Sequence, residues 1–227
     1  MKLLAIETAT EACSAALSID GEITQRYEVQ ARKHTELILP MMDSLLAEAG
    51  IALSQLDALA FGRGPGAFTG VRVATGVVQG AAFAADLPVV PVSTLAALAQ
   101  RHYREQGYQR LLPAFDARMG ELYWGAYLVD QQGLVEQQVG DQVAPPETVM
   151  LPDGDNWHAV GTGWGTYAEV LKTRLGTALA SVTPDLYCAA HDVALLGVAG
   201  FLRGEAVSAE QALPVYLRDQ VASKPKQ

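Results

Sequence analysis

An apolar hairpin at the start of the chain constrains the fold more than any other feature of the sequence. Leu3–Ile6 is a short apolar run of the kind that forms a buried strand, and Ala12–Ile19 is a longer run of small and apolar residues. Asp20–Gly21, a strong hairpin-turn signal, separates that run from a third strand-like segment, Ile23–Val29. We therefore expect the chain to open on three consecutive strands.

Helix and strand patterns then alternate over the rest of the first hundred residues. Apolar residues recur at helical spacing from Leu37 to Ala49, Gly50 suits a C-cap, and Pro40 indicates a kink or a start near it. Three antiparallel strands followed by right-handed βαβ crossovers are typical of a ribonuclease-H-like lobe. The crossover elements expected are a strand at Leu56–Gly62, a helix at about Thr69–Ala85, a strand at Leu87–Val92 and a helix capped by Ser93 that runs to about Gln106.

The second half repeats this order in a weaker form. Two duplicated lobes make the actin-like ATPase fold, in which nucleotide is usually held between the lobes, although a fold alone assigns no function. We expect one lobe in residues 1–105 and a smaller, degenerate lobe in residues 106–227, with a C-terminal tail that can return to the first lobe. The second-half strands are expected at Leu111–Asp116, Glu121–Leu128, Leu134–Val139 and His158–Gly161, and the helices at Pro145–Met150, Trp164–Leu175 and Ala189–Leu202.

Composition limits the function classes. The formal net charge is −9, with 25 acidic against 16 basic side chains, which disfavours direct binding of nucleic acid. The one cluster of basic residues is Lys224–Pro225–Lys226. No apolar stretch is long enough for a signal peptide or a membrane span, so we expect a cytoplasmic protein without membrane contact. Cys13 and Cys188 suit free thiols in a reducing compartment.

The segment Gly62–Arg72, with the sequence GRGPGAFTGVR, is the most distinctive in the chain. It is not a phosphate-binding P-loop, because no Gly-Lys-Ser/Thr follows at the required spacing. Its formal match to the dinucleotide pattern G-x-G-x-x-A is weak. The segment predicts a loop with unusual backbone angles before a helix that Thr69 caps, and direct phosphate binding is the alternative.

Two apolar faces predict either core packing or contact with a partner. Gly76, Gly80 and Ala84 recur every four residues, and glycine costs about 1 kcal/mol against alanine in a helix. Another helix, from this chain or from a partner, is expected to approach that face closely. The stripe that includes Leu37, Met41 and Leu45 is wider than a narrow core seam, and methionine-rich faces adapt to partners.

Constellations for metal binding or nucleophilic catalysis are not found in the sequence. The four histidines are widely separated, and neither H-E-x-x-H nor G-x-S-x-G occurs. Two acids remain, Glu7 and Asp116, at the ends of the first strand of each half. Together with Thr8, Thr10 and Arg118 they would face each other across the cleft, which makes them candidates for a vestigial nucleotide site.

Five segments together resemble one family. They are Ala5–Ser14, Gly62–Arg72, Asp116–Tyr123, Gly161–Trp164 and Pro214–Arg218, and the chain is similar over its length to TsaB, the bacterial tRNA threonylcarbamoyladenosine biosynthesis protein also called YeaZ. The resemblance implies an accessory paralogue of the transferase TsaD, which modifies the adenosine next to the anticodon. TsaD carries two metal-binding histidines where this chain has Thr94 and Leu98. Glu7 stands where the family often has aspartate, which weakens a catalytic role for it.

The resemblance also implies partners. It implies a heterodimer with TsaD, joined by TsaE and ATP, contact with tRNA only through that complex, and a homodimer when the chain is alone. No cofactor is firmly implied for the chain itself, although the complex can bind ATP. First-lobe helices mediate the pairing, which favours Leu37, Met41, Leu45, Gly76 and Gly80 as interface residues. The alternative is an enzyme, either an ATPase or an M22-type zinc endopeptidase, and the missing histidine pair argues against the peptidase.

Overall fold

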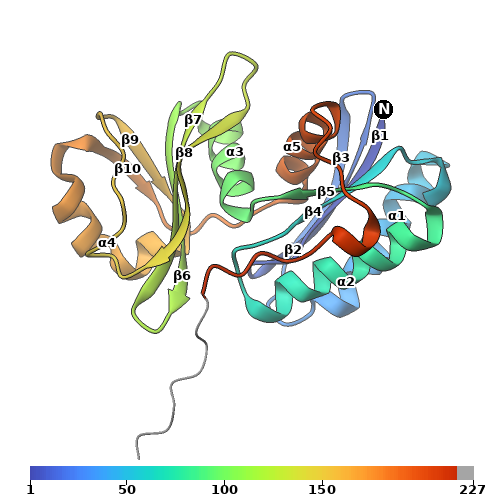
Figure 1. The fold of residues 1–227 in the computed structure, drawn as a ribbon, viewed down its shortest axis with the longest axis horizontal. Helices are drawn as coiled ribbons and strands as arrows, with labels where there is room; N and C mark the ends of the chain where they lie inside the picture. Colours follow the sequence, from blue (N-terminus) through green and yellow to red (C-terminus); the bar gives the residue numbers. More distant parts are fainter. Residues whose placement is uncertain (219–227) are drawn as a thin grey trace, which may run out of the picture.

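Two α/β lobes, each built on a five-stranded sheet, form the computed structural model, which describes residues 1–218 (Figure 1). The first sheet has the order β3-β2-β1-β4-β5 and the second has the order β10-β9-β6-β7-β8. In each sheet three antiparallel strands come first in the sequence, and two parallel strands then extend the sheet on the other side of the first strand. The predicted actin-like fold with duplicated ribonuclease-H-like lobes is therefore confirmed.

The first lobe follows its predicted elements closely. Its strands are β1 (Lys2–Glu7), β2 (Ala12–Ile19), β3 (Glu22–Val29), β4 (Ala58–Gly62) and β5 (Val89–Val92). Helices α1 (His34–Ala49) and α2 (Phe68–Ala85) cover one face of this sheet, and α5 (Ala190–Leu202) covers the other. A short 3-10 turn, η1 (Leu53–Gln55), precedes β4.

The second lobe has the same plan with α3 and α4 on its two faces. Helix α3 (Thr94–Gln106) leads from the first sheet into the second, and α4 (Thr162–Leu175) packs on the opposite face. The 3-10 turn η2 (Gly176–Ala178) belongs to this lobe, whereas η3 (Ala209–Gln211) follows α5 and packs on the first lobe. The strands are β6 (Arg110–Arg118), β7 (Glu121–Val129), β8 (Val135–Ala144), β9 (Trp157–Val160) and β10 (Leu179–Thr183).

Local sequence signals explain several of these boundaries. Asp20 and Gly21 have the positive φ angles that a tight hairpin requires, at 50° and 94°. Gly50 ends α1 in the left-handed conformation, as predicted, with φ at 63°. The Ser93 hydroxyl accepts a hydrogen bond of 3.3 Å from the amide of Ala96, which confirms it as the N-cap of α3.

Four sequence-based expectations differ from the structure. Thr69 does not cap α2, because the helix begins one residue earlier and its N-cap Ala67 offers no side-chain acceptor. Pro40 lies inside α1 and does not mark its start. Pro145–Met150 forms a turn closed by the amide of Thr148 and the carbonyl of Pro145, and not the short helix that was expected. The sequence pattern did not predict strand β10 (Leu179–Thr183), whose partly buried residues give only a weak apolar signal.

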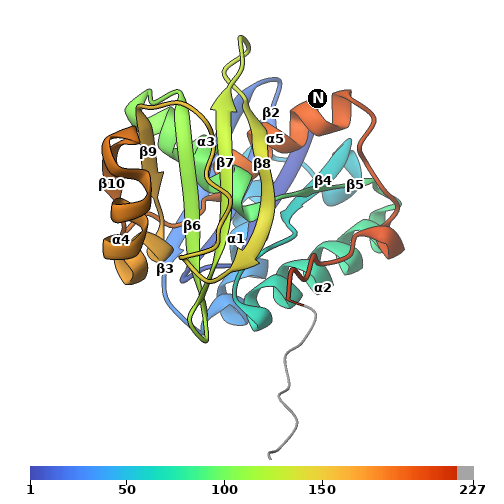
Figure 2. The same cartoon turned by 60° about the vertical axis from the view of Figure 1, so that its left-hand side comes forward.

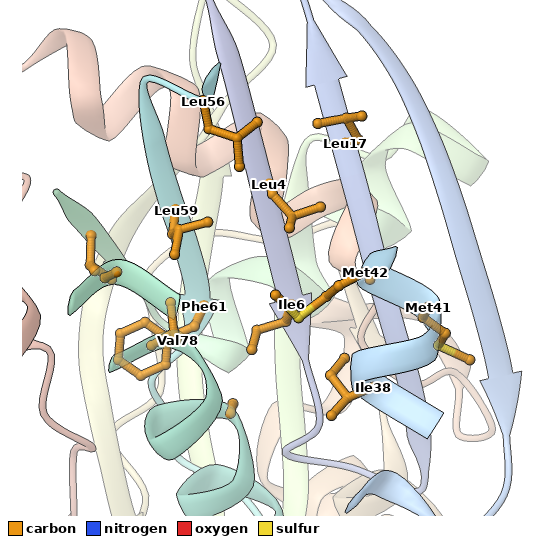
Figure 3. Packing of buried hydrophobic residues seen from close by; sticks show 14 of the residues in the cluster. Leu4, Ile6, Leu17, Ile38, Met41, Met42, Leu56, Leu59, Phe61 and Val78 are labelled. Carbon is orange, nitrogen blue, oxygen red and sulfur yellow. The ribbon is translucent and has the colours of Figure 1, made fainter. Parts of the chain in front are cut away.

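The core of the first lobe contains the apolar stripe of α1. Leu4 and Ile6 of β1 point toward α1 and α2, as Figure 3 shows, while Leu3 and Ala5 point toward α5. Met41 and Leu45 are 9% and 1% exposed, and both pack in this core. Burial against the sheet, at about 1.5–3 kcal/mol for a side chain of this kind, accounts for these two residues within the chain, while the contact of Leu37, Met41 and Leu45 with a partner stays a prediction.

The chain crosses between the lobes twice in the sequence. It leaves the first sheet through α3 and returns through residues 184–189 into α5. Residues 203–218 then remain on the first lobe and run along α2 before they reach the second sheet, as Figures 1 and 2 both show.

The division of the chain at residue 105 stays a prediction, and the Lys224–Lys226 cluster lies outside the described residues. Within residues 1–218, no helix is long and apolar enough to cross a bilayer.

Candidate functional site

A cleft of about 780 Å³ lies between the two lobes. The turn between β1 and β2, the N-terminal end of α2 and the C-terminal segment form its first-lobe side. The end of β6, one residue of β7 and the N-terminal end of α4 form the other side. The lining residues are Ala9, Thr10, Glu11, Gly66, Ala67, Phe68, Val71, Arg72, Phe115, Asp116, Ala117, Arg118, Tyr123, Thr162, Thr166, Val215, Tyr216, Leu217 and Arg218.

The structure brings together only some of the predicted site residues. Thr10, Asp116 and Arg118 line the cleft from its two sides. Glu7 and Thr8 are fully buried and do not line the cleft. The five residues were expected to face one another across the cleft, but only Thr10, Asp116 and Arg118 are among its lining residues. Their grouping as one nucleotide site stays a prediction.

Glu7 is a buried carboxyl group committed to the backbone of its own turn. Its Oε1 accepts a hydrogen bond of 2.5 Å from the amide of Ala9, and its Oε2 has no hydrogen-bond partner among residues 1–218. A Cβ atom at residue 62 would overlap this carboxyl group, which explains why Gly62 ends β4. Burial raises the pKa of Glu7 to about 7, and the backbone hydrogen bonds partly offset that rise. A carboxyl group in this position braces the turn and does not face a ligand in the cleft.

The glycine-rich segment packs directly on that turn. The Thr8 hydroxyl donates a hydrogen bond of 2.7 Å to the carbonyl of Gly70, and the Ala67 amide donates one of 2.8 Å to the carbonyl of Ala9. Added Cβ atoms at Gly66 and Gly70 would collide with the backbone of Ala9 and Thr8. Close approach of two backbone segments therefore accounts for these glycines.

Asp116 stabilises the tip of the β6–β7 hairpin. Its carboxylate accepts hydrogen bonds from the amide of Arg118 at 2.8 Å and from the guanidinium of Arg118 at 2.9 Å. Arg118, Met119 and Gly120 all have positive φ angles, at 63°, 58° and 81°, so the turn needs this support. Arg118 itself is 79% exposed at its side chain and projects from the second lobe at the cleft.

The C-terminal segment contributes cleft residues that sequence reasoning did not identify. The guanidinium carbon of Arg72 lies 3.2 Å from the centroid of the Phe68 ring and 4.8 Å from that of Tyr216. Arg218 forms an ion pair with Glu121 at 2.5 Å. The motif Pro214–Arg218 signalled that this segment matters, but its position across from the hairpin depends on contacts about 100 residues apart.

The outer face of α2 is open to solvent. Gly76 and Gly80 are exposed, and a Cβ atom added at either would meet no atom within 4 Å. On the same helix Phe83 is 84% exposed. No helix in residues 1–218 approaches these glycines, so the expected close neighbour is not supplied by the described part of this chain.

Thr94 and Leu98 both lie in the interior. Each is fully buried, and the Thr94 hydroxyl accepts a hydrogen bond of 3.1 Å from the amide of Gly64. Leu98 packs in the apolar cluster between α3 and the second sheet. In the described residues, no group of three or more His, Cys, Asp or Glu side chains is placed to hold a metal ion.

The family profile and the curated relatives that match this chain belong to one family. The profile of the family described as "TsaD: tRNA N6-adenosine threonylcarbamoyltransferase" matches residues 22–226. The chain is 44% identical to the tRNA threonylcarbamoyladenosine biosynthesis protein TsaB of Escherichia coli, over 99% of this chain and 97% of that protein. It is 39% identical to the TsaB protein of Haemophilus influenzae, over 99% and 96% of the two chains.

A solved structure gives the same result at the level of the fold. The structure described as "YeaZ from Pseudomonas aeruginosa" superposes with a TM-score of 0.89 at 52% identity, covering 95% of this chain and 99% of that one. A second Pseudomonas aeruginosa structure, described as an uncharacterized protein with similarity to peptidase YEAZ, has a TM-score of 0.90 at 51% identity, over 96% and 99% of the two chains.

Proposed function

This chain belongs to the TsaB family of tRNA threonylcarbamoyladenosine biosynthesis proteins, within the wider TsaD family, and on that premise we propose that it is a non-catalytic subunit of the modification machinery. In this proposal it binds and activates the transferase TsaD in the cytoplasm, together with TsaE and ATP. It contacts tRNA only through that complex. Alone, it pairs with a second copy of itself.

The observation that carries the proposal is the open face of α2. Glycines inside a helix cost stability, at about 1 kcal/mol each against alanine, and here no described part of the chain uses the space that they leave. Phe83 adds a large exposed ring to the same helix. A partner helix packed on Gly76 and Gly80 would recover that cost and bury the ring. We therefore keep these two glycines as interface residues and add Phe83, while Leu37, Met41 and Leu45 stay less favoured candidates because Met41 and Leu45 pack in the core and Leu37 is partly buried against it.

The accessory role is also supported by the interior of the chain. Thr94 and Leu98 stand where the resemblance puts the metal ligands of TsaD, and both are enclosed by their own neighbours. Glu7 is enclosed as well and is bonded to its own turn. An ATPase or a zinc endopeptidase would need groups of this kind to be free for a metal. Measuring zinc content and peptide cleavage by the purified chain separates the alternatives, since stoichiometric zinc with robust turnover would exclude the accessory role.

Reconstitution of threonylcarbamoyl transfer tests the proposal directly. Purified TsaD, TsaE, ATP, the threonylcarbamoyl donor and tRNA are combined with and without this chain, and the modified adenosine is quantified. We expect transfer to depend on the chain. Equal transfer in its absence, or no complex with TsaD by size-exclusion chromatography, would exclude the subunit role.

A pair of matched variants locates the interface. Gly80→Phe places a large ring on the α2 face, and Gly140→Phe places the same ring at an exposed glycine of β8 with no atom near its Cβ position. We expect Gly80→Phe to weaken binding to TsaD at least ~10-fold, about 1.4 kcal/mol, and Gly140→Phe to leave it unchanged. If both folded variants bind TsaD like the parent chain, α2 is not the interface.

A further inference from the structure

The C-terminal strap, defined as residues Leu213–Arg218, connects the two lobes on the cleft side of the molecule. It follows η3, which packs against α2, and it runs along that helix before it reaches the tip of the β6–β7 hairpin (Figures 1 and 2). Four of its residues, Val215 to Arg218, line the cleft. The strap therefore forms part of the cleft wall and spans from one lobe to the other.

Backbone and ring contacts hold the strap on the first lobe. The Val215 amide donates a hydrogen bond of 2.8 Å to the carbonyl of Arg63, and just before the strap the Gln79 side chain donates one of 3.1 Å to the carbonyl of Ala212. The ring of Tyr216 lies 6.3 Å from that of Phe68. These contacts come from the glycine-rich segment and α2, so this end of the strap is tied to the first lobe at several points.

Within residues 1–218, the hydrogen bonds that attach the strap to the second lobe all come from the side chain of Arg218. The guanidinium of Arg218 donates hydrogen bonds of 3.0 Å and 2.5 Å to the Glu121 carboxylate and one of 3.2 Å to the carbonyl of Arg118. The side chains of Arg218 and Glu121 are 17% and 30% exposed, so water screens this pair less than an ordinary surface ion pair. This end of the strap depends on a single ion pair and its accompanying hydrogen bonds.

The covalent crossings leave the cleft side free to open. The chain passes between the lobes through α3 and through residues 184–189, neither of which lines the cleft. Each sheet has a hydrophobic core of its own. On the side of the crossings, α3 also packs against the first lobe through Ala97 and through the ion pair of Arg104 with Asp192 of α5, so a rotation that opens the cleft would hinge at this side. On the cleft side, the strap joins the two lobes through the hydrogen bonds of Arg218.

From this arrangement we propose that the strap is a latch, and that release of Arg218 from Glu121 lets the two lobes separate and the cleft widen. The first-lobe contacts keep the strap in place during release, so the Arg218 end alone disengages. The hairpin tip at Arg118–Glu121 loses its support at the same time, because Arg218 bonds both ends of that turn. The proposal concerns motion within this chain and stands independently of its role with TsaD.

Inter-lobe distances measured between spin labels test the latch. Glu36→Cys on α1 and Lys172→Cys on α4 are exposed positions on opposite lobes, and the full chain carries both. The native Cys13 and Cys188 do not compete for the label, because both are buried and burial raises the pKa of each thiol, that of Cys13 to about 12. Distances between the two labels are recorded by pulsed electron–electron double resonance in the labelled chain and in its variants.

Three variants give the expected pattern. Arg218→Ala should lengthen and broaden the distance distribution, and it should raise amide exchange in the 118–121 hairpin about tenfold, equivalent to ~1.4 kcal/mol. Arg203→Ala removes the guanidinium of another ion pair, Arg203–Glu205, which lies within the first lobe, and should change neither quantity. The charge swap Arg218→Glu with Glu121→Arg should restore both quantities toward the parent values.

The outcomes separate a latch from a purely local contact. Circular dichroism melting first confirms that each variant is folded. An Arg218→Ala chain that is folded and keeps the parent distance distribution would overturn the proposal, whatever its hairpin exchange. A charge swap that leaves the lobes apart in a folded chain would also overturn it, because the ion pair would then not be what holds them.

Discussion

The Glu7 carboxyl group is unusual in its surroundings, because one oxygen braces a turn and the other has no partner. A buried charge is costly unless it is paired, and no cation is bonded to this one. Folding therefore favours the protonated form, and the pKa of Glu7 rises from 4.5 to about 7. Because the folded chain binds this proton more tightly than the unfolded chain, Glu7 lowers the free energy of unfolding as pH rises through that range.

Glu7→Gln should therefore stabilise the protein above neutral pH. The amide keeps an oxygen for the Ala9 amide and carries no charge, so the free energy of unfolding at pH 8.5 should rise by up to about 3 kcal/mol. The gain should shrink from pH 7 downward and vanish near pH 4.5. Urea titrations at several pH values measure this, with Glu22→Gln on the exposed edge of β3 as control. A gain that is independent of pH would contradict the assignment.

His102 shows the opposite behaviour. Its ring is fully buried on α3, and neither nitrogen has a hydrogen-bond partner in the described part of the chain. The ring packs against Tyr108, which stacks on His158 with 3.6 Å between the ring centroids. Burial, and after it the charge of His158, lower the pKa of His102 from 6.5 to about 4. The folded chain thus binds this proton less tightly than the unfolded chain, so His102 costs stability as pH falls below 6.5.

His102→Leu should remove that acid sensitivity. Relative to the parent, the variant should gain on the order of 2 kcal/mol in unfolding free energy between pH 6.5 and pH 4, because leucine takes up no proton. The comparison is made by denaturant titration at matched pH, and His34→Leu serves as the control on an imidazole that is only partly buried. Parallel pH profiles for the parent and His102→Leu would show that this ring does not titrate as its surroundings predict.

At the scale of the element, α2 has two faces with different requirements. Its inner face carries Gly70, which lies against the backbone of Thr8, and its outer face carries Gly76 and Gly80, which touch nothing within 4 Å of a Cβ position. The same residue type therefore serves close packing on one face and leaves an unoccupied surface on the other. The two faces make a matched test, because both kinds of glycine lie within one helix.

Gly70→Ala and Gly80→Ala should change stability in opposite directions. The first should destabilise the chain by about 1–3 kcal/mol or more, because its methyl group overlaps the Thr8 carbonyl. The second should stabilise it by about 0.5–1 kcal/mol, because alanine is the better helix former and finds open space. Thermal and urea unfolding measure both changes. Equal effects would mean that α2 does not sit on the turn as described.

Elements set by local chemistry could be predicted from the sequence. Asp20–Gly21 requires a hairpin and Ser93 caps a helix, because turn and cap geometry depend on a few adjacent residues. Pro145–Met150 was predicted wrongly as a helix, because a segment of six residues can close one turn without continuing into a helix. The stripe with Met41 and Leu45 could not be assigned, because periodicity shows that a face is apolar but not what covers it.

The same distinction between local sequence signals and long-range packing applies to the candidate site. Thr10 and Asp116 could be placed near each other, because equivalent turns of two duplicated lobes meet at the cleft. Glu7 is buried against Gly62 and does not line the cleft, a packing detail that strand patterns do not contain. Tyr216 and Arg218 join the site through contacts across about 100 residues or more, and local sequence carries no signal of that distance.

At the scale of the whole molecule, an exposed aromatic ring on the outer face of α2 combines with a strongly acidic net charge. The chain carries a net charge of −9, so two copies repel each other unless apolar contact outweighs that repulsion. Phe83 is 84% exposed on the outer face of α2, beside the glycines that leave room for a neighbour. We propose that this surface is where two copies meet when TsaD is absent.

Phe83→Glu should then convert the isolated chain to a monomer. A carboxylate in place of the ring would have to be buried without a partner and would add to the negative charge of both copies, so the dimerisation constant should fall at least ~100-fold, about 2.7 kcal/mol. Leu202→Glu makes the same change at a 76% exposed residue on α5, which covers the opposite face of the sheet, and should leave association intact. Sedimentation equilibrium measures both variants against the parent. A dimer that survives Phe83→Glu, or one that Leu202→Glu disrupts equally, would move the contact surface away from α2.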